Sequence, residues 1–189
     1  MDEKSIICVL QKEKTRKGIK KYIEIMENIQ KINVSNTNDP KTNDFQRNFN
    51  SFYKLRRGEQ FRNAYYSFLE YNKKRKPSFI KVLRKLYRFG NLEASFASKL
   101  LATINPKLPI WDKLVLDYFK LEPPSRTLPP EERIKQANAV YEELRKKYKE
   151  LIDKDEGQKM IELFNRYYPK IKEKIMPIKK IDFIIWQSR

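Results

Sequence analysis

Apolar side chains recur at every third or fourth position along most of this chain, and that spacing constrains the fold more than any other feature. In residues 14–32, for example, Ile19, Tyr22, Met26 and Ile29 fall on one face of a helix. Runs that alternate apolar and polar residues, which indicate strands, are few. The chain has 4 glycines and 10 prolines, and several of them separate the helical segments. The sequence therefore predicts an all-α fold.

The interruptions divide the chain into expected helices and connections. We expect helices over about 14–32, 44–57, 59–72, 79–88, 92–103, 111–119, 130–150, 157–168 and 169–186, the last one broken at Pro177. Residues 33–42 are polar and contain a proline, which predicts a loop, and the Pro-rich residues 122–130 predict a linker before the C-terminal helices of 131–189. The length of 189 residues suits one domain, 1–189, with two lobes around a cleft.

The net charge points to a polyanionic partner. The chain carries 42 Lys and Arg against 24 Asp and Glu, a formal net charge of +18. The basic residues are spread along the whole sequence instead of forming one tail. Because no apolar run approaches the roughly 20 residues that span a bilayer, a nucleic acid is favoured over a membrane as the partner.

The scarcity of histidine and cysteine removes several kinds of site. The chain has no histidine and a single cysteine, Cys8. Catalytic triads and Cys–His pairs that need an imidazole are therefore excluded, as are zinc sites built on histidine. One cysteine holds neither an iron–sulfur cluster nor an intramolecular disulfide. We expect no metal and no cofactor.

The most informative segment is 79–119. It is expected to form a helix, a tight turn at Gly90, a second helix with small residues on one face, a Pro-bounded loop, and Asp112 at the start of a third helix. Backbone N–H groups at a helix start attract anions such as phosphate. The purely structural interpretation of Asp112 is that it is the N-cap of its helix, which is a common role for aspartate.

This segment resembles the helix-hairpin-helix superfamily of DNA glycosylases. Gly90 matches the second glycine of the hairpin, and residues 109–115 (PIWDKLV) match the block that carries the catalytic aspartate. The resemblance covers residues 79–119 and has two departures. Arg88 replaces the first glycine of the hairpin, and Lys113 follows the aspartate in a chain that has no histidine to offer there.

The resemblance implies a helix-hairpin-helix glycosylase fold and a DNA N-glycosylase that flips a damaged or modified base out of double-stranded DNA. Asp112 would stabilise the oxocarbenium-like sugar and orient water, which leaves an abasic site. Leu92 stands where bifunctional members carry a Schiff-base lysine, so a monofunctional hydrolase is expected. A monomer in the prokaryotic cytoplasm or nucleoid is implied, active in DNA repair or in phage defence.

Several further residues are candidates for contact with DNA. The candidates for the DNA backbone are Arg56, Arg57, Arg88, Gly90, Asn91, Lys99 and Lys113. Trp111, next to the aspartate, and Tyr53 are candidates for the base pocket. Most other aromatic residues of 45–66 lie at helical spacing and are expected in the core.

Two other functions stay open at this stage. The chain fits a non-catalytic helical protein that binds DNA or RNA, and an Asp112 that only caps its helix, with no cavity beside it, would favour this alternative. A metal-dependent nuclease needs clustered acidic residues, and Asp117, Glu122, Asp153 and Asp155 form no convincing cluster in the sequence. The base that a glycosylase would excise is not readable from the sequence.

Overall fold

The computed structural model describes residues 1–188, and within that range the chain forms helices and connections without a β-strand. The prediction of an all-α fold is therefore confirmed. In chain order the elements are α1 (Glu3–Gln11), α2 (Glu13–Asn28), α3 (Pro40–Tyr53), α4 (Glu59–Asn72), α5 (Phe79–Tyr87), α6 (Ala94–Ile104), α7 (Lys113–Phe119), α8 (Pro130–Asp153), α9 (Asp155–Tyr167), the 3₁₀ turn η1 (Lys172–Lys174) and α10 (Pro177–Gln187).

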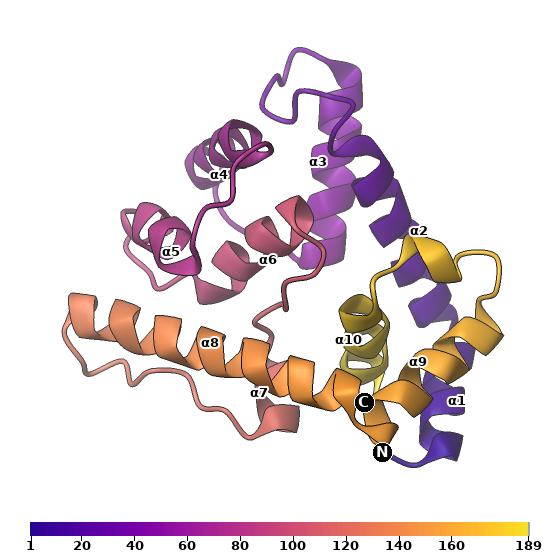
Figure 1. The fold of residues 1–189 in the computed structure, drawn as a ribbon. Coiled ribbons are helices and arrows are strands. Elements are labelled where there is room, and N and C mark those ends of the chain that lie inside the picture. Colours follow the sequence, from indigo (N-terminus) through magenta and orange to yellow (C-terminus); the bar gives the residue numbers. More distant parts are fainter. Residues whose placement is uncertain (189) are drawn as a thin grey trace.

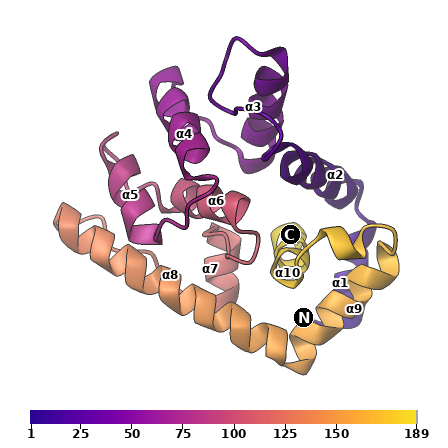
Figure 2. The same cartoon turned by 45° about the horizontal axis from the view of Figure 1, so that its top comes forward.

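Helix α10 is the central element of the arrangement. It contacts α1, α2, α7, α8 and α9, and its residues are buried without interruption from Ile178 to Ile185. A helix buried on all sides belongs inside a larger assembly of helices. The long α8 runs along one edge of the molecule and contacts α5, α7, α9 and α10 (Figures 1 and 2).

The aromatic residues of α3 and α4 form much of the core beside this centre. Phe49 lies 4.6 Å from Tyr53, 5.9 Å from Tyr65 and 5.7 Å from Tyr66, measured between ring centroids. These four side chains are all buried, and for Phe49, Tyr65 and Tyr66 this agrees with the prediction from helical spacing. Their packing fixes the end of α3 against α4, and the end of α3 borders the site described below.

Helix boundaries differ from the predictions where proline and capping residues were misinterpreted. Helix α3 begins at Pro40, inside the expected loop, because Asp39 caps it by accepting a hydrogen bond from the N–H of Lys41 at 2.9 Å. Proline is favoured at the first position of a helix, where its missing N–H has no partner to lose. Helix α1 was not expected at all, and before Pro177 the chain forms the turn η1 instead of a regular helix.

The predicted hairpin is present as two helices that contact each other, α5 and α6. Gly90 lies in the turn with a φ of 90°, a conformation that favours glycine. The small residues Ala94, Ala97 and Ser98 are buried, which allows the close packing that their size predicts. Residues 121–129, which cover most of the expected linker, form no helix.

Candidate active site

A pocket of about 320 Å³ lies where α2, the end of α3, α6, the start of α7 and α10 approach one another. This volume is at the lower end of the roughly 300–1,000 Å³ that is typical of small-molecule sites. The elements that form it are far apart in the sequence, from Lys14 to Gln187. The pocket therefore exists only in the complete fold.

Asp112 lines this pocket and also caps α7. Its Oδ1 accepts a hydrogen bond from the N–H of Leu114 at 3.0 Å, and the side chain is half-buried. Oδ2 has no hydrogen-bond partner among residues 1–188. The capping role and a role in the pocket are thus compatible, because the cap occupies one oxygen of the carboxylate.

Lys99 of α6 lines the same pocket, with 8% of its surface exposed. Its ammonium group donates a hydrogen bond to the main-chain oxygen of Tyr53 at 3.0 Å. Burial lowers the pKa of Lys99 to about 8, and the negative charge of Asp112 offsets part of that effect. Lys99 was a candidate for contact with the DNA backbone, and the structure shows it buried in the lining of the pocket.

Aromatic rings form one wall of the pocket. The ring of Phe52 lies 6.3 Å from Phe183 and 6.0 Å from Trp186, and Phe183 and Trp186 are 6.2 Å apart. Tyr53 also lines the pocket, as expected, while its hydroxyl is buried without a hydrogen-bond partner among residues 1–188. Flat apolar surfaces of this kind suit the stacking of a planar ring.

Lysines surround the mouth of the pocket. Lys14, Lys17 and Lys21 follow one another at helical spacing on α2, and Lys54 ends α3 in the left-handed conformation with a φ of 54°. Lys17 pairs with the exposed Glu13 at 2.8 Å, an interaction of small energetic value. The pocket therefore has a positively charged rim suited to phosphates on either side of a bound nucleotide.

The predicted hairpin residues Arg88, Gly90 and Asn91 are exposed at the turn between α5 and α6. Arg56 is exposed as well, and so is Lys113, whose ammonium group pairs with Asp117 at 2.8 Å. All five residues are therefore accessible to a ligand from solvent. None of these five residues lines the pocket.

The loop between α3 and α4 connects the pocket with the hairpin. At one end, the Tyr53 main chain holds Lys99, and at the other, Arg57 pairs with Glu93 at 3.3 Å. Glu93 is the N-cap of α6, and Lys99 lies six residues further along, roughly 9 Å at the helical rise of 1.5 Å per residue. Arg57 is thus held by the protein at the start of the hairpin's second helix.

Trp111, the other expected pocket residue, lies in the core instead. It is 7% exposed, its ring is stacked on Phe79 at 6.2 Å, and its main-chain N–H donates a hydrogen bond to Ser98 Oγ at 2.8 Å. The sequence interpretation did not identify Phe183 and Trp186 as residues of the pocket. It also missed the lysines of α2, although their spacing along one helix face was visible.

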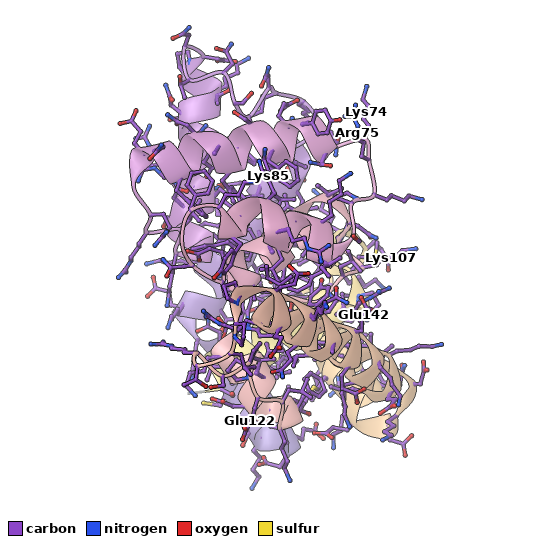
Figure 3. The ribbon with its side chains drawn as sticks, turned by 90° about the vertical axis from the view of Figure 1, so that its left-hand side faces the viewer. Lys74, Arg75, Lys85, Lys107, Glu122 and Glu142 are labelled. Carbon is purple, nitrogen blue, oxygen red and sulfur yellow. The ribbon has the colours of Figure 1, made fainter. Side chains whose placement is uncertain are left out.

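Positive charge is not confined to the pocket. Figure 3 shows the side of the molecule on which α4, α5 and α8 lie. Lys85 of α5, Lys74 and Arg75 of the turn after α4, and Lys107 of the loop after α6 are on this side, together with Glu142 of α8 and Glu122. In residues 1–188 no three acidic or cysteine side chains gather to form a possible metal site. Residues 1–188 therefore contain no cluster of metal ligands of the kind that a metal-dependent nuclease needs. None of the helices described is long and apolar enough to cross a membrane.

Comparisons of this chain with models of protein families, with curated proteins and with solved structures found no match.

Proposed function

We propose that this protein is a DNA glycosylase that excises a damaged or modified base and leaves an abasic site. The observation that carries the proposal is the place of Asp112, which lines a pocket instead of only capping a helix. A cap without a cavity would have favoured a protein that only binds nucleic acid. The helix-hairpin-helix fold, with two lobes around a cleft, is part of the same proposal.

The chemistry follows from what the pocket offers. A base turned out of the duplex stacks on the aromatic wall, and its sugar lies beside the free Oδ2 of Asp112. As the bond between C1′ and the base nitrogen breaks, its electron pair leaves with the base and C1′ becomes cationic. The carboxylate stabilises that cation and orients a water molecule, which adds its hydroxyl to C1′ while its proton goes to the departing base.

The lysines at the mouth of the pocket supply the contact with the DNA backbone. Lys14, Lys21 and Lys54 lie at the mouth of the pocket, and the turn at Gly90 presents main-chain groups near the start of α6. Phosphate contacts of this kind release counterions, so the affinity for any duplex falls steeply as salt is raised. The partner is double-stranded DNA bound by one copy of the chain.

The decisive experiment is incubation with duplexes that carry damaged bases or the modified bases of phage DNA, followed by alkaline cleavage of abasic sites. The Asp112→Asn variant is expected to lose at least about a hundredfold in excision rate, because its amide lacks the stabilising charge. It is expected to fold, since asparagine also caps helices, and to bind DNA as the wild type does.

Asp117→Asn is the matched control, because Asp117 is an exposed aspartate on the same helix and pairs only with Lys113. This variant should keep full activity. Excision that survives in Asp112→Asn would overturn the role of Asp112. No strand breaks with any base would favour a non-catalytic protein that binds DNA or RNA.

We place the enzyme among the monofunctional hydrolases. Leu92 occupies the position at which the resemblance gives bifunctional members a lysine, and a leucine forms no Schiff base. Within residues 1–188, Lys99 is the one amine that lies buried in the pocket, and it donates a hydrogen bond to the Tyr53 main chain. Borohydride reduction during the reaction should trap no covalent adduct, and a trapped adduct would assign lyase activity to the protein.

A further inference from the structure

The residues that line the pocket carry more positive than negative charge. Five lysines border it, at positions 14, 17, 21, 54 and 99, against the single carboxylate of Asp112. Four of these lysines lie at the mouth, whereas Lys99 is inside, with only 8% of its surface exposed. Since a partly dry site screens charges less than water does, a ligand in the pocket experiences a positive field.

The pocket also has more hydrogen-bond donors than acceptors. An ammonium group carries three N–H donors, and among residues 1–188 that of Lys99 is bonded only to Tyr53 O. Trp186, which lines the pocket from α10, holds a buried indole N–H that has no acceptor among the described residues. Buried donors without partners are costly, so a ligand that supplies acceptor oxygens is favoured.

The aromatic wall alone would favour a positively charged base over a neutral or anionic one. Rings such as Phe52, Phe183 and Trp186 attract cations through their faces, and a positively charged alkylated purine would profit from them. In this pocket such a base would come close to the ammonium group of Lys99, and repulsion between like charges in a partly dry site opposes that gain.

We propose that the pocket selects neutral or anionic bases rich in carbonyl oxygens, excludes cationic alkylated purines, and uses Lys99 as the residue that makes this distinction. The proposal rests on the glycosylase activity proposed above and names the substrate class of that site. Lys99 acts here as a hydrogen-bond donor and as a positive charge, and forms no covalent bond.

The test is single-turnover excision from duplexes that carry 8-oxoguanine, 5-hydroxyuracil or the cationic N7-methylguanine, with spontaneous loss of each base as the blank. The wild type should excise a carbonyl-rich base and remove N7-methylguanine no faster than the blank. We compare the excision rate of the carbonyl-rich base with that of N7-methylguanine. Lys99→Met, which keeps the length of the side chain but not the charge, should lower the ratio of these two rates by roughly tenfold or more. Lys99→Arg keeps the charge and should keep the preference.

Lys20→Met is the matched control, because Lys20 is an exposed lysine of α2 outside the pocket, and its ratio should equal that of the wild type. Excision of N7-methylguanine as fast as that of the carbonyl-rich bases would overturn this inference and leave the glycosylase proposal intact. A folded Lys99→Met with an unchanged ratio would overturn the role of Lys99. If neither 8-oxoguanine nor 5-hydroxyuracil is excised, this inference fails, and the glycosylase proposal fails with it only if the wider panel of damaged and phage-type bases is left intact as well.

Discussion

Two of the lysine–aspartate sites in residues 1–188, Lys179 with Asp182 and Lys99 with Asp112, are built in opposite ways. Lys179 and Asp182 of α10 are fully buried and form an ion pair at 2.6 Å, and the hydroxyl of Tyr148 donates to the second oxygen of Asp182. Lys99 and Asp112 both line the pocket but form no ion pair with each other within residues 1–188, and each is held by a main-chain group. The first site is closed, and the second is open.

The comparison teaches that a lysine and an aspartate are available to a ligand only if they do not satisfy each other's charge. In the closed site each charge satisfies the other, which is how a buried ion pair avoids the cost of unpaired charges. In the open site the main chain fixes the position of Lys99 and Asp112 but leaves a carboxylate oxygen and ammonium donors free for a ligand. The two sites are also connected, since Lys179 lies 4.5 Å from the ring of Trp186 on the pocket wall.

The largest expected effect comes from breaking the closed site. Lys179→Met should lower the free energy of unfolding by about 3–5 kcal/mol, because it leaves the carboxylate of Asp182 buried without its cation. Burial already raises the pKa of Asp182 and lowers that of Lys179, so neither charge is stable alone. Urea unfolding followed by circular dichroism measures the change.

The double variant Lys179→Met/Asp182→Leu should recover most of the lost stability, since an apolar pair of similar size needs no partner. Lys146→Met removes one member of the exposed pair with Glu150 and should change stability by less than about 1 kcal/mol. If the single variant Lys179→Met unfolds like the wild type, the buried pair is not the structural site described here.

The sequence predicted the helices of this fold better than it predicted which of them meet. Helix α4 has the expected bounds, because Gly58 and the basic turn after Asn72 mark its ends clearly. Gly90 was correctly placed in a turn for the same kind of local reason. Helix α3 began earlier than expected, since the pattern of an aspartate before Pro40 was taken for a loop.

The candidate site depended on contacts that a single sequence does not show. Asp112 was placed by a local motif, and it does line a pocket. The burial of Lys99 was not predicted, because it results from packing against the end of α3. Trp111 was a pocket candidate because it adjoins Asp112 in the sequence, but it packs in the core, whereas the packing of α10 brings Trp186 to the pocket.

The second effect is a pH dependence that belongs to the open site. Because burial lowers the pKa of Lys99 from 10.5 to about 8, the unfolded chain keeps a proton between these values that the folded protein has released. The stability of the folded state therefore rises with pH across this window, by up to about 3 kcal/mol from Lys99 alone. Below pH 8 Lys99 is protonated in both states, so the free energy of unfolding is reduced by the full cost of burying its charge.

This dependence is measured as the difference in free energy of unfolding between the wild type and Lys99→Met from pH 7.5 to 10.5. Lys99→Met should be the more stable protein at pH 7.5, and its advantage should disappear as the pH rises. Ionisation of the buried tyrosines affects both proteins and cancels in the difference. An advantage that stays constant with pH would show that Lys99 is not buried as a charged group.

The smallest expected effect tests whether the pocket wall has room. Gly18 lies inside α2 and lines the pocket, and a Cβ atom added there would be 3.5 Å from the ring of Phe183, an ordinary contact distance. Gly18→Ala should therefore raise the free energy of unfolding by about 0.5–1 kcal/mol, because alanine restricts the unfolded chain and favours the helix. Gly90→Ala should instead lower it by about 1 kcal/mol or more, since its φ of 90° strains any side chain. Thermal unfolding of both variants gives the comparison, and a loss of stability in Gly18→Ala would mean that the wall at α2 is as closed as the core around Lys179.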